Sequence, residues 1–226
     1  ANNVMVSATH NHAGPAVANV GDVPRDEKYL QWMVSRVKDA FGLAIKNMVE
    51  AEIGFNHVFE FEVAHNRRVV MRDGTVKTHG TFKDSNALFI EGPIDPEVAV
   101  IAVREKNGSP IGCIVNFSCH PTHFGGEEVI SAGYPGVFVR EMKANGWPVA
   151  LFLNGPSGNV HTSNPATGGG MTMEEAGNKI AKDALNAISN MNFVTDWILS
   201  ASSETVQLSY RRYTNGEVEG KIRGAQ

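Results

Sequence analysis

Short apolar runs typical of β-strands alternate along this chain with segments of helical periodicity, and this alternation constrains the fold more than any other feature. Strand-like runs cover residues 4–8, 58–63, 98–103, 111–117, 149–153 and 205–208. Apolar residues recur at helical spacing within residues 26–52, 135–144 and 172–189. Strands that alternate with helices predict an α/β fold, with a mixed β-sheet flanked by helices.

The turn signals and the length of the chain refine this picture. The turn at residues 106–109 predicts a hairpin between the two strand-like runs on either side of it, whereas we expect residues 66–97 to be irregular. A length of 226 residues suits one large domain. Because the chain opens directly into a strand-like run, we expect residues 1–226 to be a single α/β domain that lacks the N- and C-terminal parts of a longer protein.

The charge balance and the hydropathy exclude several classes of partner. Lysine and arginine number 20 against 24 acidic residues, which gives a net charge of −4. Proteins that bind nucleic acids or anionic membrane surfaces are usually basic, so we expect no nucleic-acid partner. No apolar run approaches the ~18–20 residues of a membrane-spanning helix. We therefore expect no transmembrane segment, and any membrane contact would be peripheral; no feature of the sequence indicates an oligomeric state.

The two cysteines are too far apart to form a disulfide with each other. Cys113 and Cys119 are six residues apart along one predicted strand, which places them about 20 Å apart at ~3.3 Å per residue. A disulfide spans only about 4.4–6.8 Å between Cα atoms. We expect two free thiols, which do not indicate a cellular compartment.

Histidines gather where the strand-like runs end. The run at residues 4–8 leads into His10 and His12, and later runs lead into His120, His123 and His161. In α/β sheets, ligands bind beyond the carboxyl ends of the strands. The histidines at these strand ends therefore predict a metal site at the carboxyl edge of the sheet.

The spacing of the first two histidines suits a zinc ion. If the first strand continues, His10 and His12 point to one face, and His120 from another strand end would add a third imidazole. Catalytic zinc sites hold three protein ligands and a water molecule, which the ion acidifies until it can act as a nucleophile. Chance or a structural use of the histidine pair remains the alternative. The histidines at 57, 65 and 79 are interpreted as ordinary loop or surface residues.

Two further polar groups follow predicted strands. Residues 154–159 (N-G-P-S-G-N) could cradle an anion with their backbone N–H groups or could simply form a tight turn. This segment lacks the lysine of a P-loop, and no G-x-S-x-G motif is present, which disfavours nucleotide hydrolysis and a serine nucleophile. Arg67 could bind a carboxylate or an oxyanion in a bidentate manner, or it could lie on the solvated surface.

Several motifs of this chain resemble those of the neutral, non-lysosomal ceramidases. Residues 7–15 (S-A-T-H-N-H-A-G-P) are similar to the signature S-A-T-H-T-H-S-G-P of that family. Residues 116–122 (N-F-S-C-H-P-T) resemble its N-F-A-x-H-x-T segment, and the Asn66-Arg67 pair matches its N-R dipeptide. The stretch from residue 66 to residue 97 is more similar still to ceramidase-like bacterial proteins of unsettled substrate. The resemblance extends from residue 1 to about residue 210.

This resemblance implies an activity and a set of roles. The family hydrolyses the amide bond of ceramide with one zinc ion, so His10 and His120 are expected to be zinc ligands. His12 would handle protons near the metal-bound water, and Arg67 would bind the substrate or its developing oxyanion. A glutamate and a tyrosine from a later part of the family's chain complete the zinc shell. Nothing in this sequence matches those two residues, which agrees with a fragment.

Departures from the family pattern concern the substrate pocket. Asn159 replaces an aspartate, His161 stands where the family has a serine, and Gly133 replaces an acidic residue. Loss of carboxylates near a metal changes its affinity and the acidity of its bound water. We therefore expect His161 to take a catalytic role or to approach the metal, and Asn154 and Asn159 to contact the substrate.

The resulting hypothesis is a zinc-dependent amidohydrolase whose metal-activated water cleaves an N-acyl lipid, a ceramide-like substrate or a related small molecule. Two alternatives remain, namely a ceramidase-like binding protein without catalysis, and a zinc hydrolase of a non-lipid ester or amide. The resemblance also implies that the protein is secreted, periplasmic or attached to the cell surface.

Overall fold

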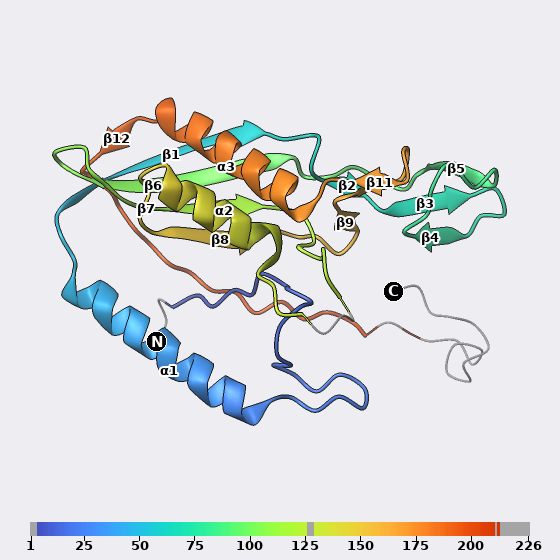
Figure 1. The fold of residues 1–226 in the computed structure, drawn as a ribbon, viewed down its shortest axis with the longest axis horizontal. Coiled ribbons are helices and arrows are strands. Elements are labelled where there is room, and N and C mark those ends of the chain that lie inside the picture. The colour runs from blue at the N-terminus through green and yellow to red at the C-terminus, as the bar shows by residue number, and fades with distance from the viewer. Residues whose placement is uncertain (1–3, 126–128, 211, 213–226) are drawn as a thin grey trace.

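The computed structural model describes residues 4–125, 129–210 and 212, and it shows an α/β fold built around a mixed sheet (Figure 1). The five-stranded sheet has the order β12-β1-β6-β7-β8. Its strands are β1 (Ala51–Phe59), β6 (Glu97–Glu105), β7 (Pro110–Phe117), β8 (Ala150–Asn154) and β12 (Phe193–Val194). Three helices accompany the sheet: α1 (Glu27–Lys46), α2 (Gly133–Ala144) and α3 (Met173–Ser189). The predicted fold class is confirmed.

Smaller sheets extend from one end of the main sheet (Figure 1). The order β4-β3-β5 forms a three-stranded sheet, and β2 pairs with β9 and β10 with β11. These strands are β2 (His65–Asn66), β3 (Arg68–Met71), β4 (Val76–Thr78), β5 (Ala87–Ile90), β9 (Val160–His161), β10 (Ser163–Asn164) and β11 (Gly169–Gly170). The pairing of β2 with β9 brings the segment before Arg67 next to the segment that contains His161.

One pairing direction decides where the site forms. The β1, β6 and β7 strands pair antiparallel, and residues 106–109 join β6 to β7 as the predicted hairpin. In contrast, β7 and β8 are parallel neighbours joined through α2. Because parallel strands end at the same edge of a sheet, the segments after β7 and β8 both emerge there. The histidine-bearing loops 118–123 and 155–161 are therefore adjacent.

The two faces of the sheet have different surroundings. On one face, cross-strand neighbours such as Val100 and Val115 are buried under α2 and α3. Phe138 of α2 packs edge-on against Phe152 of β8 there. The two helices approach closely because α3 has a glycine at 177, where a Cβ atom would lie 2.8 Å from the Tyr134 carbonyl oxygen. This face forms the hydrophobic core.

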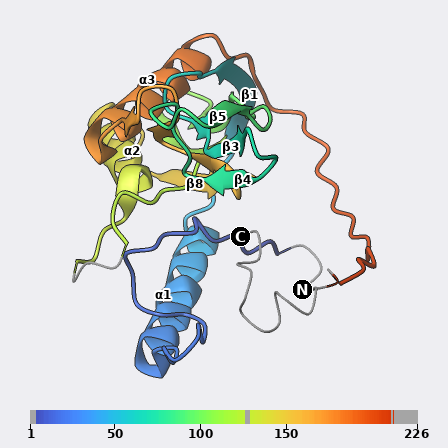
Figure 2. The ribbon, with the colours of Figure 1, turned by 90° about the vertical axis from the view of Figure 1, so that its right-hand side faces the viewer.

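The opposite face carries apolar side chains that remain exposed. Phe55, Ile101, Ile114 and Leu151 are register partners in one row across four strands, and all but Ile114 are largely exposed. Helix α1 does not cover this face, since it stands away from the sheet and has no buried residue (Figure 2). The helices therefore flank the sheet on one side only.

Several predicted elements differ from the structure. Residues 4–8 and 205–208 form no strand, because neither segment has a strand partner among the described residues to accept its hydrogen bonds. The predicted helix over 26–52 ends at Lys46, and the strand predicted at 58–63 lies instead at 51–59. Glu60, which the alternation placed on a wet face, is buried and forms an ion pair with Lys179 at 2.8 Å.

The region over residues 66–97 was predicted to be irregular, and that prediction is wrong for much of it. This region contains β3, β4 and β5, which pair antiparallel. The turn at residues 73–74, with Gly74 at a positive φ of 83°, reverses the chain between β3 and β4. Among the described residues, no helix is both long enough and apolar enough to cross a membrane.

Candidate metal centre

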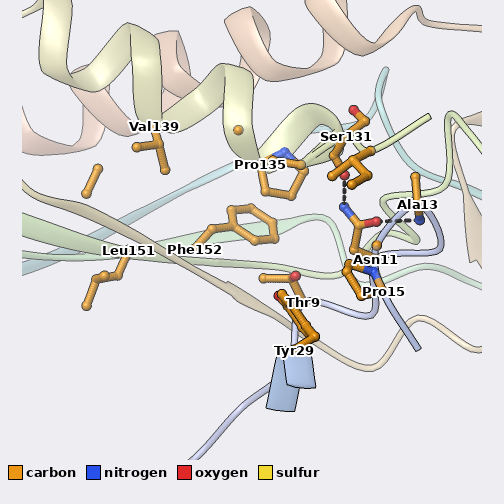
Figure 3. A pocket seen from close by; sticks show the side chains of 15 residues that line it. Thr9, Asn11, Ala13, Pro15, Tyr29, Ser131, Pro135, Val139, Leu151 and Phe152 are labelled. Atoms are coloured by element: carbon orange, nitrogen blue, oxygen red, sulfur yellow. Dashed lines mark hydrogen bonds between the residues drawn. The ribbon is translucent and has the colours of Figure 1, made fainter. Parts of the chain in front are cut away.

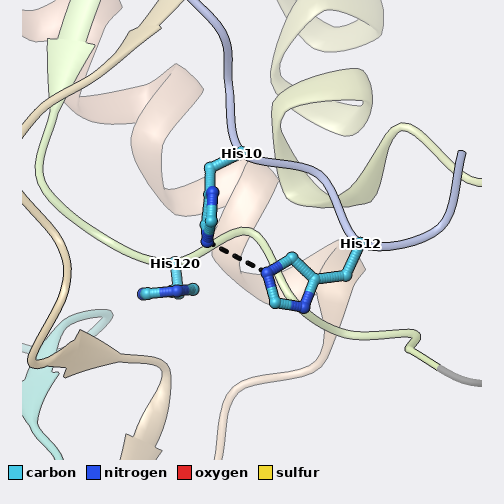
Figure 4. Close-up of side chains that lie close together, drawn as sticks. All are labelled: His10, His12 and His120. Atoms are coloured by element: carbon cyan, nitrogen blue, oxygen red, sulfur yellow. Dashed lines mark hydrogen bonds between the residues drawn. The ribbon is translucent and has the colours of Figure 1, made fainter. Parts of the chain in front are cut away.

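Three histidines from two distant parts of the chain meet at the edge of the sheet (Figure 4). Ring nitrogens of His10, His12 and His120 all lie within 4.8 Å of one another. The Nε2 atoms of His10 and His12 are 3.0 Å apart, and the His120 ring centroid is 4.6 Å from that of His10. We call these three residues the histidine cluster.

The body of the fold holds His120 firmly. This residue follows β7 and is only 5% exposed. Its Nδ1 atom donates to the carbonyl oxygens of Ser157, at 2.6 Å, and Val160, at 3.2 Å. Because a carbonyl can only accept, Nδ1 carries the hydrogen and Nε2 keeps its lone pair for a ligand. The Tyr134 hydroxyl of α2 fixes the preceding residue by donating to the Cys119 carbonyl at 2.9 Å.

A loop, not a strand, brings His10 and His12 together. His10 has a left-handed backbone with φ of 59°, so the predicted strand geometry around this pair is wrong. The Asn11 side chain accepts from the Ala13 N–H and donates to the Ser131 carbonyl, both at 2.6 Å. The Ser131 N–H in turn donates to the Ala13 carbonyl at 3.0 Å. Asn11 therefore fastens the loop to the segment before α2.

The electrostatic surroundings favour neutral imidazoles at His12 and His120. Burial, then the charges of His10 and Arg67, hold the pKa of His12 below its usual range. The pKa of His120 is also lowered, chiefly by burial, although its hydrogen bonds to backbone carbonyls act in the opposite direction. Metals bind the neutral form of imidazole. The lowered pKa values of His12 and His120 therefore favour the neutral form that a metal ligand needs.

The donor set of the cluster fits zinc. Zinc prefers nitrogen donors at about 2.0–2.1 Å in a tetrahedral arrangement, so two ligand nitrogens are expected about 3.4 Å apart. The 3.0 Å between the Nε2 atoms of His10 and His12 is close to that separation. The Nδ1–H of His120, bonded to a carbonyl oxygen, is the outer hydrogen bond typical of a metal-binding histidine. All three side chains could hold the ion.

Arg67, His79 and His161 lie beside the cluster. The guanidinium of Arg67 donates to the Nε2 atom of His79 and to the Gly158 carbonyl, each at 2.8 Å. The ring of His161 is 5.2 Å from that of His79 and 6.3 Å from that of His120. Burial, followed by the charges of His79, Arg67 and His120, lowers the pKa of His161 to about 4.

His161 lies outside the histidine cluster, and its ring nitrogens have other partners. Its Nδ1 atom accepts from the Ser163 N–H at 3.0 Å, and the ring also has a hydrogen bond to the backbone of Thr122. His79 is the residue that the sequence analysis missed, since it contacts Arg67 directly instead of lying free on the surface. The Asp73-Gly74 turn signal could have predicted the hairpin that places His79 opposite Arg67 and Arg68.

The two asparagines expected to contact the substrate hold the loop after β8. With its amide oriented to satisfy both groups, Asn154 donates to the Cys119 carbonyl at 2.9 Å and accepts from the Ser157 hydroxyl at 3.1 Å. The Asn159 carbonyl accepts from the Arg67 N–H at 2.8 Å. Both residues therefore support the backbone that positions His120 and Arg67, and their contact with a substrate stays a prediction.

The structure gives a reason for Gly133, where the ceramidases carry an acidic residue. Gly133 has a positive φ of 62°, and a Cβ atom there would lie 2.8 Å from the Pro121 carbonyl oxygen. An acidic side chain would therefore strain the backbone and press against the segment that follows His120. In this chain, the start of α2 has no room for the missing carboxylate.

An apolar cavity lies close to the histidine loop (Figure 3). Its volume is 590 Å³, and it is lined by residues of the loop, of α1, of α2 and of β8. Thr9, Asn11 and Ala13 form the loop side of this cavity, whereas none of the three clustered histidines lines it. The loop thus separates the apolar cavity from the imidazole rings.

The fold is similar to part of the structure of ceramidases. The structure is similar to that of neutral ceramidase from Pseudomonas aeruginosa, with a TM-score of 0.63 and 20% identity over 81% of this chain. It is also similar to the structure of a ceramidase complexed with C2, with a TM-score of 0.64 and 20% identity over 83% of this chain. No protein-family model matches the sequence, and no curated protein matches it. The chain spans only 30% and 31% of these two structures.

Proposed function

We propose that this chain forms the zinc-binding part of a hydrolase that cleaves the amide bond of an N-acyl lipid, a ceramide-like substrate or a related small molecule. The observation that carries the proposal is the histidine cluster, in which His10, His12 and His120 present their nitrogens to one point. The similarity to ceramidase structures supports the reaction class.

The residues of the cluster would have different roles in binding the metal and handling protons. His10 and His120 would bind the ion, and His12 would complete the ligand set or hold a proton at Nε2. When bound, zinc acidifies a water molecule and makes a nucleophile available near neutral pH. Arg67 is a cation whose charge acts on His12 and His120, and its guanidinium would stabilise the negative charge that develops on the amide oxygen.

The test uses the full-length protein and a panel of N-acyl amides. Hydrolysis should stop when a chelator removes the metal and should return when zinc is added back. His10→Ala should lower kcat/KM by at least about 100-fold, because removal of a ligand costs more than the ~10–100-fold typical of its outer hydrogen-bond partners. His57→Ala is the matched control, since His57 lies on β1 outside the cluster. Hydrolysis that persists after chelation and in His10→Ala would refute the proposal.

A second candidate is a ceramidase-like protein that binds its ligand without cleaving it. Asn159 and Gly133, which stand where the ceramidases have carboxylates, favour this candidate. It predicts that zinc binds but that no amide or ester in the panel is hydrolysed. Hydrolysis of a non-lipid ester or amide with N-acyl lipids left intact would instead identify a zinc hydrolase with a different substrate.

The resemblance to ceramidases also motivates a location. We propose that the protein is secreted, periplasmic or bound at the cell surface, where a lipid substrate would require peripheral membrane contact. Fractionation of the source cells, with the protein detected by antibody, tests this location directly. Recovery of the protein in the cytosolic fraction would contradict it.

A further inference from the structure

A second cavity, separate from the histidine cluster, lies between the β3–β4 hairpin and the loop that contains β10. Its volume is 220 Å³, below the ~300–1,000 Å³ of pockets that enclose whole drug-sized ligands. Arg67, His79 and Lys83 line one side, and Ser163, Asn164 and Gly168 line the other. No aspartate or glutamate is among its lining residues. We call this cavity the basic cavity.

The two cations of the basic cavity have no carboxylate partner within the described part of the chain. The guanidinium of Arg67 donates only to neutral acceptors, the His79 ring and the Gly158 carbonyl, and its buried Nε atom has no acceptor. Neighbouring cations differ, since Arg68 is paired with Glu91 and Lys77 with Asp84. The positive charge in the cavity is therefore uncompensated, whereas that around it is neutralised.

Lys83 lies against the glycine at position 168 of the opposite wall. A Cβ atom at Gly168 would lie 2.9 Å from the Lys83 Nζ atom, so the ammonium group would have to shift if this residue carried a side chain. Gly168 also has a positive φ of 70°. The loop is thus shaped to receive the lysine beside the Arg67 guanidinium.

The neutral groups of the cavity are also hydrogen-bond donors. The Asn164 side-chain oxygen accepts from the Ala166 N–H at 2.8 Å, which leaves its NH2 group without an acceptor among the described residues. Since His79 accepts from Arg67 at Nε2, its hydrogen is on Nδ1. Two cations and several neutral donors with few acceptors match a ligand that is an acceptor and carries negative charge.

The basic cavity adjoins the histidine cluster. The ring of His161 stands between them, 5.2 Å from His79 and 6.3 Å from His120. Arg67 lines the cavity, and its charge also acts on His12 and His120. One small molecule could therefore place an anionic group in the cavity and a neighbouring amide at the cluster.

We propose that the basic cavity binds an oxyanion group, a carboxylate or a phosphate, of the substrate whose amide is cleaved at the histidine cluster. Arg67 and Lys83 hold this anion, and Asn164 donates to it. This proposal rests on the proposed function, in which the histidine cluster is the site of amide hydrolysis. It adds that the preferred substrate is an anionic amide. An uncharged lipid amide would leave the half-buried Arg67 guanidinium without an anionic partner.

Binding of simple anions tests the cavity without any catalysis. The full-length protein, treated with a chelator so that no metal can hold the anion, is titrated with inorganic phosphate and with acetate, and the histidine ring resonances are followed by NMR. We expect saturable shifts for His79 and His161, and a Kd that Lys83→Gln raises about tenfold. Lys77→Gln, whose lysine pairs with Asp84 outside the cavity, is the matched control.

A pair of substrates tests the link to hydrolysis. An N-acyl amide with a carboxylate next to the amide is compared with its uncharged methyl ester, and a phosphate-bearing amide identifies which oxyanion is preferred. We expect the charged member to have the higher kcat/KM, and Lys83→Gln to lower this preference about tenfold. Equal preference in the wild type and Lys83→Gln, or no anion-dependent shift of His79, overturns the inference. Anion binding without zinc-dependent hydrolysis instead refutes only the proposed function.

Discussion

The two parts of the molecule that supply the histidine cluster differ in how firmly they are held. The body, residues 51–194, buries His120 to 5% exposure and fixes its ring by hydrogen bonds to two carbonyls. The N-terminal segment, residues 4–46, leaves His10 and His12 exposed, and its helix α1 buries no residue. One ligand is therefore positioned by the core, and two depend on a loop.

Because of this difference, a metal ion would have a structural effect in addition to its role in catalysis. The hydrogen bonds around Asn11 and Ser131 are the main described attachment of the histidine loop to the body. An ion shared by His10, His12 and His120 would add a second attachment between the two parts. Binding that occurs only in the folded arrangement stabilises that arrangement. Zinc is thus expected to order the N-terminal segment and to leave the body nearly unchanged.

The largest expected effect is on the free energy of unfolding, and it separates the two parts. Phe138 of α2 is 0% exposed and lies in the core, whereas Phe41 of α1 is 59% exposed. Phe138→Ala should cost about 3–5 kcal/mol because it opens a cavity. Phe41→Ala should change stability by less than about 0.5 kcal/mol. Urea unfolding of both variants checks the contrast, and equal losses would show that α1 is part of the core.

The second effect is on proteolysis of the N-terminal segment. Zinc should slow cleavage in residues 16–25 about tenfold, because local opening of the segment then requires release of the ion. Limited digestion with and without a chelator, followed by mass spectrometry, measures the rate at each site. Cleavage within residues 51–194 serves as the internal control and should not change. If the chelator leaves the cleavage rate at residues 16–25 unaltered, zinc does not order the N-terminal segment.

The third effect concerns the residue that fastens the loop. Asn11→Ala removes two hydrogen bonds next to the ligands and should weaken zinc binding about tenfold, as outer-shell changes commonly do. Asn19→Ala is the matched control, because Asn19 lies in the same segment and accepts from the Arg25 N–H far from the cluster in sequence. Isothermal titration with zinc compares the two. Equal affinities would mean that the loop is held by contacts other than those of Asn11.

The sequence predicted the body of the molecule better than the N-terminal segment. Five elements of the body were predicted within a few residues, because their burial on one face produces a clear apolar period, namely α2, α3, β6, β7 and β8. The segment at residues 4–8 has the composition of a strand but no partner among the described residues. Composition indicates how well a segment can form a β-strand, but a strand forms only where the tertiary structure supplies a neighbouring strand to pair with.

The same distinction applies to the site. The approach of His120 to His10 and His12 was predicted from the ends of strands, and the parallel β7–β8 pair brings His120 and His161 to one edge as expected. The left-handed backbone of His10 was not predictable, because a positive φ is uncommon for any residue other than glycine. Contacts of His79 with Arg67 depend on a hairpin whose strands are only three and four residues long. Such short strands have too little periodicity to be recognised on their own, and only the turn signal at residues 73–74 indicates the hairpin.

The last expected effect lies within the body and depends on pH. Burial, then a hydrogen bond with Glu60, raises the pKa of Asp183 to about 7. A carboxyl whose pKa is raised in the folded state stabilises the fold while it is protonated, so this contribution is lost as the pH rises through about 7. The free energy of unfolding should fall by about 1–2 kcal/mol between pH 5 and pH 8. Asp183→Asn should remove this slope, and an unchanged slope in denaturant titrations would assign it to other groups.

The most direct test of the central claim is the zinc content of the full-length protein, measured by elemental analysis after purification without chelators or nickel resin. We expect about one zinc ion per chain in the wild type and in His57→Ala, and none in His120→Ala. His120→Ala should still show the wild-type circular dichroism spectrum, since the ligand and not the fold is changed. A wild-type protein that holds no zinc even after zinc is supplied, or a His120→Ala variant that retains it, would contradict the account.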